Sequence, residues 1–442
     1  MSEKPIINII GAGLAGCEAA WQAVKLGVAV RLYEMKPQKY TPAHSSAGFA
    51  ELVCSNSLRA AALSNAVGLL KEEMYRRGSL IMEAAEATAV PAGGAVAVDR
   101  VKFSDYITEK IKNHPDIEVI EKECDGVPEG ITVIATGPLT SEPMAKFIEG
   151  LGGRGLHFFD AAAPIVDFSS VNMEKAFFAS RYGKGDADYI NCPMTAEEYD
   201  TFYRELITAQ EAPLHEFDRE EQENAKELTV FEGCMPIEVM ARRGYDTMRY
   251  GPLKPVGIID PKTEKEPFAV VQLRKENVEG SMYNLVGFQT HLTYAEQKRV
   301  FGLIPGLENA DYLRYGTMHR NTYLDSPGFL DDTYAVINRP ELFFAGQMTG
   351  VEGYVESAGS GLVAGTNAAR LALGLDKLVF PKHTMLGAMA AYVSHGSMGR
   401  FTPMNANYGI VEPLGFKVKG GKSARNEALA ARALAALDSI ND

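Results

Sequence analysis

The stretch that decides the fold of this chain runs Ile6-Ile7-Asn8-Ile9-Ile10-Gly11-Ala12-Gly13-Leu14-Ala15-Gly16. A short β-branched run meets a Gly-x-Gly-x-x-Gly pattern, after which the apolar residues take a helical spacing as far as Gly27. A second predicted strand, Val28 to Tyr33, leads to Glu34, about 20 residues after the glycines. In such a βαβ unit the glycines permit a tight turn and close approach of the backbone to a pyrophosphate, and the acidic residue meets a ribose hydroxyl. These residues therefore predict a dinucleotide site.

The same glycine pattern occurs a second time, at residues 150–155, in a different context. There it follows a predicted helix, Pro143 to Glu149, instead of a strand. A loop is the better interpretation, because the pattern indicates phosphate binding only between a strand and a helix.

Two later stretches favour FAD as the dinucleotide. Gly130 to Pro138 predicts a buried strand that ends in Ala-Thr-Gly, and Glu341 to Gln347 predicts another that ends in Ala-Gly. Small residues from Ser357 to Gly365 then open a helix that continues to Leu373. Together these pieces resemble the three-part FAD signature of large flavoproteins with two dinucleotide folds, in which the carboxy-terminal piece returns to the first domain. The predicted FAD-binding residues are Gly11, Ala12, Gly13, Leu14, Ala15, Gly16, Glu34, Thr136, Gly137, Gly346, Gln347 and Ser357.

The predicted fold class is α/β, with a Rossmann-like FAD-binding domain assembled from both ends of the chain. Residues 1–150 form its first part, and residues 326–442 form its second part together with a basic carboxy-terminal segment. Residues 151–325 form an inserted α+β domain. A shift in composition supports the insertion, because residues 195–233 contain twelve Asp and Glu against three Lys and Arg.

Composition limits the classes of function. The 442 residues carry a net charge of −13, which argues against nucleic-acid binding over the whole surface but permits a local basic patch. The cysteines are odd in number and include no Cys-x-x-Cys pair, so neither a disulfide framework nor a zinc site is indicated. We also find no apolar signal segment and no predicted membrane span, and we expect a cytoplasmic protein.

Cys54 is the first candidate nucleophile. It precedes an amphipathic helix predicted to run to about Arg77, and Ser55, Asn56 and Ser57 can all cap that helix. A thiol at a helix start lies at the positive end of the helix dipole, which favours the thiolate. The alternative for any single cysteine is a small buried hydrophobic residue.

Cys234 has the same predicted local setting. Pro236 suits the first position of a helix that ends at Gly244. Two thiols at predicted helix starts make catalysis a serious alternative to burial. Cys17 is expected to pack against the sheet, a lowered pKa is implausible for Cys124 beside like charges, and Cys192 stays open.

Five stretches carry a family resemblance: residues 11–20, 53–59, 65–74, 231–238 and 346–357. On these motifs the chain resembles the folate- and FAD-dependent tRNA (uracil-5-)-methyltransferase family over essentially its whole length. The two cysteine motifs are far more specific than the glycine pattern. Ala60, Met348 and Gly359 stand where we expect Gly, Ile and Ala, and none of them touches the expected chemistry.

The resemblance implies a function. 5,10-Methylenetetrahydrofolate gives a one-carbon unit to C5 of a uridine at position 54, in the T-loop of tRNA, and reduced FAD, regenerated by NAD(P)H, delivers the hydride. Cys234 matches the family's nucleophile for uracil C6, and Cys54 matches its second catalytic cysteine, the base or its assistant. Uracil C5 becomes nucleophilic only after a thiolate adds to C6. Since FAD occupies the one glycine motif in the right context, we expect the nicotinamide to dock transiently over the flavin, much where folate must later stack.

Basic residues in two segments are candidates for the RNA phosphates. Their alternative is ordinary solvated surface charge. The histidines show no metal-ligand spacing, and we expect no metal and no obligate protein partner. The candidates are Arg242, Arg243, Arg249 and Lys254, followed by Lys417, Lys419 and Lys422.

Three other functions stay open. The same chemistry could act on a ribosomal RNA uridine. The related flavoprotein family that modifies the tRNA wobble uridine has longer chains, and its carboxy-terminal partner-binding helices are not found here. A flavin-bearing RNA-binding or redox-sensing protein without turnover would have no need of two thiols such as Cys54 and Cys234.

Overall fold

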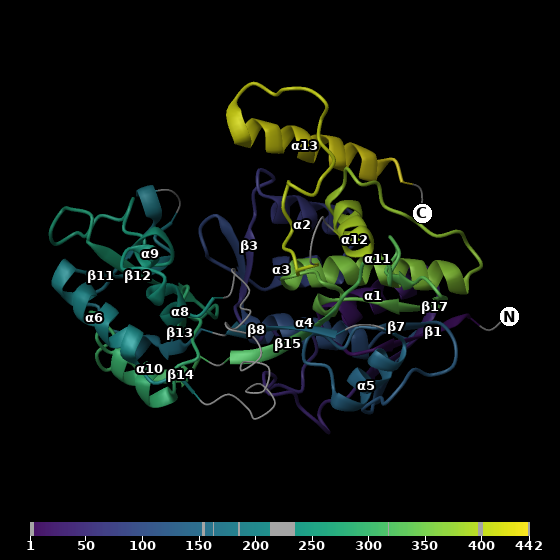
Figure 1. The fold of residues 1–442 in the computed structure, drawn as a ribbon, viewed down its shortest axis with the longest axis horizontal. Coiled ribbons are helices and arrows are strands. Elements are labelled where there is room, and N and C mark those ends of the chain that lie inside the picture. Colours follow the sequence, from purple (N-terminus) through teal and green to yellow (C-terminus); the bar gives the residue numbers. More distant parts are fainter. Residues whose placement is uncertain are drawn as a thin grey trace.

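Two six-stranded sheets organise the chain in the computed structural model, which describes residues 4–152, 155–161, 163–183, 186–212, 235–316, 318–396 and 401–440. Figure 1 shows them as two lobes. The larger lobe combines both ends of the chain, and the smaller lobe holds the middle.

The sheet of the larger lobe has the strand order β16-β17-β7-β1-β2-β6 and is parallel except at β16. Its strands are β1 (Ile6–Ile10), β2 (Ala29–Glu34), β6 (Ile117–Glu121), β7 (Thr132–Ile134), β16 (Ala335–Val336) and β17 (Arg339–Phe344). Val133 of β7 pairs with Ile9 on one side and with Phe343 on the other. Because Phe343 comes from the far end of the sequence, both ends of the chain contribute strands to one parallel sheet. This confirms the predicted fold class.

Helices and a small sheet surround this parallel sheet. The helices are α1 (Leu14–Lys25), α2 (Ala66–Arg76), α3 (Leu80–Ala87), α4 (Arg100–Lys112), α5 (Glu142–Gly150), η4 (Gln347–Thr349), α11 (Tyr354–Ala372), α12 (Met385–His395) and α13 (Gly421–Asp438). The small sheet is antiparallel and contains β3 (Ser57–Ala60), β4 (Ala89–Val90) and β5 (Ala95–Val98). The second glycine pattern begins at the last residue of α5, so it follows a helix as expected.

The sheet of the smaller lobe is antiparallel, with the order β10-β11-β12-β13-β9-β14. Its strands are β9 (Ile165–Asp167), β10 (Phe177–Ala179), β11 (Tyr189–Met194), β12 (Ala269–Lys275), β13 (Met282–Leu285) and β14 (Tyr312–Arg314). The helices of this lobe are η1 (Phe168–Ser170), η2 (Arg181–Gly183), α6 (Ala196–Thr208), α8 (Ile237–Arg242), α9 (Thr247–Tyr250) and α10 (Tyr294–Phe301).

A two-stranded ribbon marks the passage between the lobes. In it β8 (Gly155–Ala161) pairs antiparallel with β15 (Met318–Leu324). One strand precedes the second sheet in the sequence and the other follows it. We therefore keep 150 and 325 as the proposed domain boundaries.

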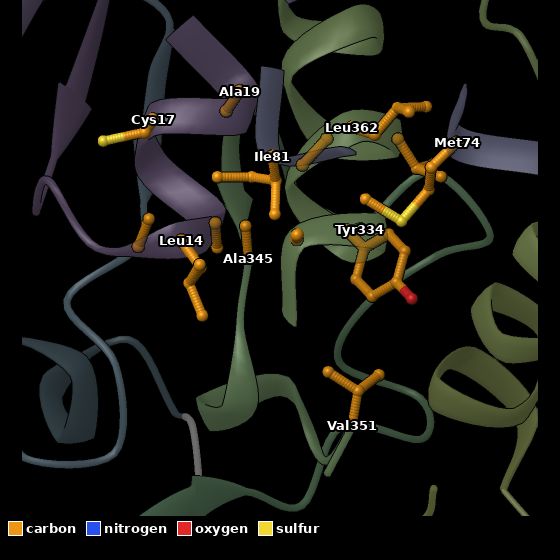
Figure 2. Close-up of a cluster of buried hydrophobic side chains, with 14 of the residues drawn as sticks. Leu14, Cys17, Ala19, Met74, Ile81, Tyr334, Ala345, Val351 and Leu362 are labelled. Atoms are coloured by element: carbon orange, nitrogen blue, oxygen red, sulfur yellow. The ribbon is translucent and has the colours of Figure 1, made fainter. Parts of the chain in front are cut away.

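The packing of α1 on α11 forms the centre of the larger lobe. A β-carbon on Gly361 would lie 2.2 Å from the carbonyl oxygen of Ala15, and one on Gly365 would lie 2.4 Å from the Cα of Ala19. Only glycine fits where two helix backbones approach this closely. Figure 2 shows Ala19 of α1 and Leu362 of α11 in the same buried cluster.

Gly361→Ala is expected to destabilise the protein, because its new methyl group would overlap the backbone of Ala15, which is part of α1 and cannot change rotamer as a side chain can. Overpacking of this kind costs about 1–3 kcal/mol in the free energy of unfolding, which urea titration measures. Gly359→Ala on the same helix is the control, since the atoms nearest its methyl group are side-chain atoms of Leu70, Leu386 and Met74, at 3.3, 3.4 and 3.7 Å. It should be neutral or up to about 1 kcal/mol more stable. Equal stability of the two variants would contradict the close packing.

Candidate functional site

A cavity of about 480 Å³ opens where β1, β2, β7 and β17 end. Ligands bind at this edge of open parallel sheets. Eleven of the twelve predicted FAD-binding residues line the cavity: Gly11, Ala12, Gly13, Leu14, Ala15, Glu34, Thr136, Gly137, Gly346, Gln347 and Ser357. Gly16 does not, and its role is internal, because a β-carbon there would lie 1.8 Å from the carbonyl oxygen of Gly11.

Two helix starts face this cavity without side-chain caps. Gly13 is the N-cap of α1 and Gly353 is the N-cap of α11, and neither start receives a side-chain hydrogen bond. Uncapped backbone N–H groups and the helix dipole both favour a phosphate. A β-carbon on Gly13 would meet nothing within 4 Å, so this loop leaves room for a group to approach. These features fit the pyrophosphate of FAD.

Glu34 lies at the end of β2, beside the glycine loop. One carboxylate oxygen accepts the N–H of Ala12 at 2.8 Å, and the other accepts the N–H of Lys36 at 3.0 Å. The carboxylate is thereby held at the cavity wall, and each of its oxygens keeps a lone pair for a ribose hydroxyl.

Cys54 lines the same cavity, but the predicted helix start is wrong. After Cys54 the chain forms β3, whose Ser57 pairs with Ala97 of β5, and α2 begins only at Ala66 with Asn65 as its N-cap. The residues expected to cap a helix make other contacts. The dipole of α2 therefore gives no reason to expect a thiolate at Cys54.

Arg274 of β12 holds the residues that follow Cys54. Its Nε donates to Oδ1 of Asn56 at 3.0 Å, and its Nη2 donates to Oγ of Ser55 at 2.6 Å. Asn56 in turn donates through Nδ2 to the carbonyl of Lys275 at 2.9 Å. The smaller lobe thus fixes the Cys54 loop. Arg274 could not be predicted as part of the site, because nothing near it in the sequence indicates a contact more than 200 residues away.

Tyr354 holds the same loop from the larger lobe. Its hydroxyl oxygen accepts the N–H of Cys54 at 2.6 Å and the N–H of Ser55 at 3.2 Å. Burial raises the pKa of Tyr354. Tyr354 belongs to one of the family motifs, residues 346–357, but no role for it was predicted. It connects the first turn of α11 to the candidate nucleophile.

Cys234 lies outside the described residues. The described chain resumes at Met235, which is buried, and continues into α8, in agreement with the helix predicted after Pro236. The N–H of Ile237 donates to the carbonyl of Gln289 at 2.7 Å, and Gln289 lines the cavity. The segment that follows Cys234 is therefore attached to the cavity wall.

Glu238 strengthens this attachment. Its buried carboxylate accepts the hydroxyl of Thr290 at 2.9 Å and the N–H of His291 at 2.7 Å. Burial raises its pKa to about 7. Helix α8 and residues 289–291 are thus joined by hydrogen bonds from both backbone and side chain.

The other cysteines are structural by their surroundings. Cys17 and Cys192 are fully buried, and burial raises the pKa of both thiols, that of Cys192 to about 12. Burial also raises the pKa of Cys124, although this residue lines part of the cavity. Among the described residues, no group of His, Cys, Asp and Glu could hold a metal ion, and no helix is long and apolar enough to cross a membrane.

The predicted RNA-binding residues fall into two groups on different lobes (Figure 1). In the smaller lobe Arg242 pairs with Glu211, and the guanidinium carbon of Arg249 lies 3.7 Å from the ring centre of Phe268. The exposed members are Arg242, Arg243 and Lys254 near α8 and α9, and Lys417, Lys419 and Lys422 near the start of α13. Among the described residues, no interaction joins the group near α8 and α9 to the group near α13.

Comparison with known proteins shows the family of this chain. Residues 6–376 match the family described as Glucose inhibited division protein A, GidA. The chain is 60% identical to the methylenetetrahydrofolate--tRNA-(uracil-5-)-methyltransferase TrmFO of Acetivibrio thermocellus, with 97% of each chain covered. It is 58% identical to TrmFO of Lactiplantibacillus plantarum, covering 100% of this chain and 98% of that one. The chain belongs to the GidA/TrmFO family.

Solved structures show the same fold. The structure of Aquifex aeolicus GidA in its form II crystal covers 99% of this chain and 74% of its own, with a TM-score of 0.70 and 17% identity. Its form I crystal gives the same TM-score over 100% of this chain and 77% of its own. At this identity the likeness establishes the fold alone.

Gly13→Leu is expected to abolish flavin retention while the chain still folds. Gly13 has φ −74°, which a leucine adopts without strain, and its side chain would enter the space beside the uncapped start of α1. The measurement is flavin absorbance per protein, with the released flavin identified by chromatography.

Gly94→Leu is the matched control, since a β-carbon there also meets nothing within 4 Å. It should retain FAD. A Gly13→Leu protein with full flavin content would contradict this site, as would a wild-type protein that carries FMN or that cannot be reconstituted with FAD.

Proposed function

We propose that this chain is a folate- and FAD-dependent tRNA (uracil-5-)-methyltransferase that acts on a T-loop uridine. Relatives that carry the name methylenetetrahydrofolate--tRNA-(uracil-5-)-methyltransferase are 56–60% identical to it over nearly their full lengths. The observation that carries the proposal is the shared cavity: Cys54 lines the same space as the dinucleotide residues. A thiol beside a flavin site fits a reaction that needs both.

In this proposal the larger lobe holds FAD. The uncapped starts of α1 and α11 bind its pyrophosphate, Glu34 accepts a ribose hydroxyl, and Gly346, Gln347 and Ser357 line the remaining wall. When bound and reduced, the flavin supplies the hydride that completes the methyl group, and methylenetetrahydrofolate supplies the carbon. NAD(P)H is the proposed reductant. Since the glycine loop after β1 is taken by FAD, we place the nicotinamide transiently in the same cavity.

Cys234 is the proposed nucleophile. Its thiolate sulfur bonds to C6 of uracil, and the electron pair of the C5–C6 double bond moves to C5 and the neighbouring carbonyl. C5 can then bond to the one-carbon unit. Cys54, or a base that it assists, accepts the C5 proton, and the electron pair of that C–H bond expels the folate nitrogen that carried the one-carbon unit, which leaves a methylene group on C5. When the hydride adds to this methylene, the double bond returns between C5 and C6 and the C6–sulfur bond breaks. The thiolate of Cys234 is thus regenerated.

The chain should form a denaturation-resistant adduct with a T-arm RNA that contains 5-fluorouridine, given methylenetetrahydrofolate and NAD(P)H. Fluorine cannot leave C5 as a proton does, so the C6–sulfur bond persists. Mass spectrometry of the digested adduct should place the bond at Cys234. Cys234→Ala should lose both adduct and methylation, and Cys54→Ala should lose methylation.

Cys192→Ala is the control, because Cys192 is buried in β11 and should be dispensable for the chemistry. A ribosomal RNA fragment with 5-fluorouridine should give no adduct. Full methylation by Cys234→Ala, or a bond at another cysteine, would overturn the assignment of the nucleophile. An adduct with the ribosomal fragment and none with the T-arm RNA would show that the substrate is ribosomal RNA instead of tRNA.

RNA affinity should be electrostatic and local despite the net charge of −13. Binding of tRNA, measured by fluorescence anisotropy, should weaken as salt rises, and Lys419→Glu should reduce the salt slope by about one. Arg242→Glu should act in the same direction, less strongly because Arg242 pairs with Glu211. Lys146→Glu on α5 is the control, since Lys146 is also surface-exposed and lies outside both basic groups. If the variants at Lys419 and Arg242 bind tRNA like the wild type, the two basic groups do not form the RNA-binding surface.

A further inference from the structure

Three tyrosine rings in the smaller lobe form a continuous stack. The rings of Tyr312 and Tyr315 are 5.1 Å apart and inclined by 13°, and those of Tyr315 and Tyr294 are 4.7 Å apart and inclined by 16°. Tyr294, the first residue of α10, is the outer member and is 56% exposed. The stack therefore runs outward and ends in a largely exposed ring.

Core packing does not account for the outer two rings. Tyr312 packs against the hydrophobic core of the smaller lobe, but Tyr315 and Tyr294 do not belong to that core. The hydroxyl of Tyr312 is buried and finds no hydrogen-bond partner in the part of the chain that the structure describes. A buried tyrosine usually satisfies its hydroxyl. Tyr312 is therefore held by the near-parallel stacking of its ring, and its hydroxyl makes no hydrogen bond within the described part of the chain.

The stack lies beside the cavity that contains Cys54. The chain runs from Gln289 in the cavity wall to Tyr294 in five residues, a span of at most about 18 Å. Arg314 stands between Tyr312 and Tyr315 in the sequence. Burial lowers its pKa, and three groups of the cavity wall, Tyr354, Cys54 and Glu51, lie near enough to affect it. In Figure 1, α10 and β14 lie together in the smaller lobe.

A positive charge accompanies the exposed ring. Lys298 follows Tyr294 by one helical turn on α10, so the two side chains share one face of the helix. Lys298 is exposed, and no ion pair to it is found among the described residues. A flat aromatic face beside a lysine is suited to a base and its neighbouring phosphate.

We infer that Tyr294 is a stacking platform for an unpaired RNA base next to the reacting uridine, with Lys298 binding the adjoining phosphate. This inference rests on the proposed function. A uridine that reaches Cys54 must leave its own stack, and this costs a few kcal/mol because its neighbours lose a stacking partner. The exposed ring at the end of the tyrosine stack replaces that partner. An RNA base fits better than a peptide side chain because the contact offers one planar aromatic face and a cation.

The test is binding of a T-arm RNA to the full-length flavoprotein, with 2-aminopurine in place of either base beside the target uridine. Tyr294→Ala should weaken binding about 5- to 150-fold and abolish the quenching of 2-aminopurine. Tyr294→Phe should retain both, since it keeps the ring. Tyr294→Leu should behave like the alanine variant, because it keeps apolar bulk without an aromatic face.

Tyr75→Ala is the matched control, since Tyr75 on α2 has the same exposed fraction, 56%. It should bind RNA like the wild type. In all four variants the flavin absorbance and NAD(P)H oxidation without RNA should be unchanged, which establishes that they fold. Wild-type affinity and quenching in Tyr294→Ala would overturn the inference, and so would an equal loss in Tyr294→Phe. A wild-type protein that binds the RNA but never methylates it would instead overturn the proposed function, while the quenching comparison would still decide the role of Tyr294.

Discussion

The close approach of α1 and α11 is the constraint on which the site depends. Gly361 and Gly365 let the backbone of α11 rest on the backbone of α1 at Ala15 and Ala19. The two helices come from opposite ends of the chain, so this contact closes the larger lobe. It also brings both uncapped helix starts to one cavity. A larger residue at Gly361 would displace the start of α11, and with it Tyr354, which holds the Cys54 loop.

The smaller lobe completes the site through buried polar contacts. Arg100 donates to the carbonyl of Leu52 at 2.7 Å and forms a buried ion pair with Glu276 at 2.9 Å. Arg274 adds its contacts to Ser55 and Asn56. Such ion pairs contribute little net stability, but breaking one leaves an uncompensated buried charge. The Cys54 loop is therefore positioned by two lobes at once, and its geometry depends on their relative arrangement.

The parts of the site that could be predicted are those whose structure is decided by neighbouring residues in the sequence. The strand-glycine-helix order of residues 6–16 is decided by neighbours in the sequence, and the structure has it. The helix start predicted at Cys54 failed because Ser57 pairs with Ala97, a contact made 40 residues away that outweighs local capping preference. Arg274 and Gln289 could not be found, since Arg274 contacts Ser55 and Asn56 across the two lobes and Gln289 accepts the N–H of Ile237 from a distant part of the chain. The roles of Cys54 and Cys234 came from a family resemblance, and they stay predictions.

In an acidic protein that binds RNA, the affinity comes both from local positive charge and from base stacking. Of the predicted phosphate contacts, Arg242 is tied to Glu211 and Arg249 lies against Phe268, so neither is wholly available to a ligand. Each phosphate contact that is lost lowers the affinity gained from counterion release. Stacking on an aromatic ring has no such dependence on net charge. The tyrosine stack beside the cavity therefore offers this chain an affinity that its overall charge of −13 does not oppose, at the place where the reacting base must be held.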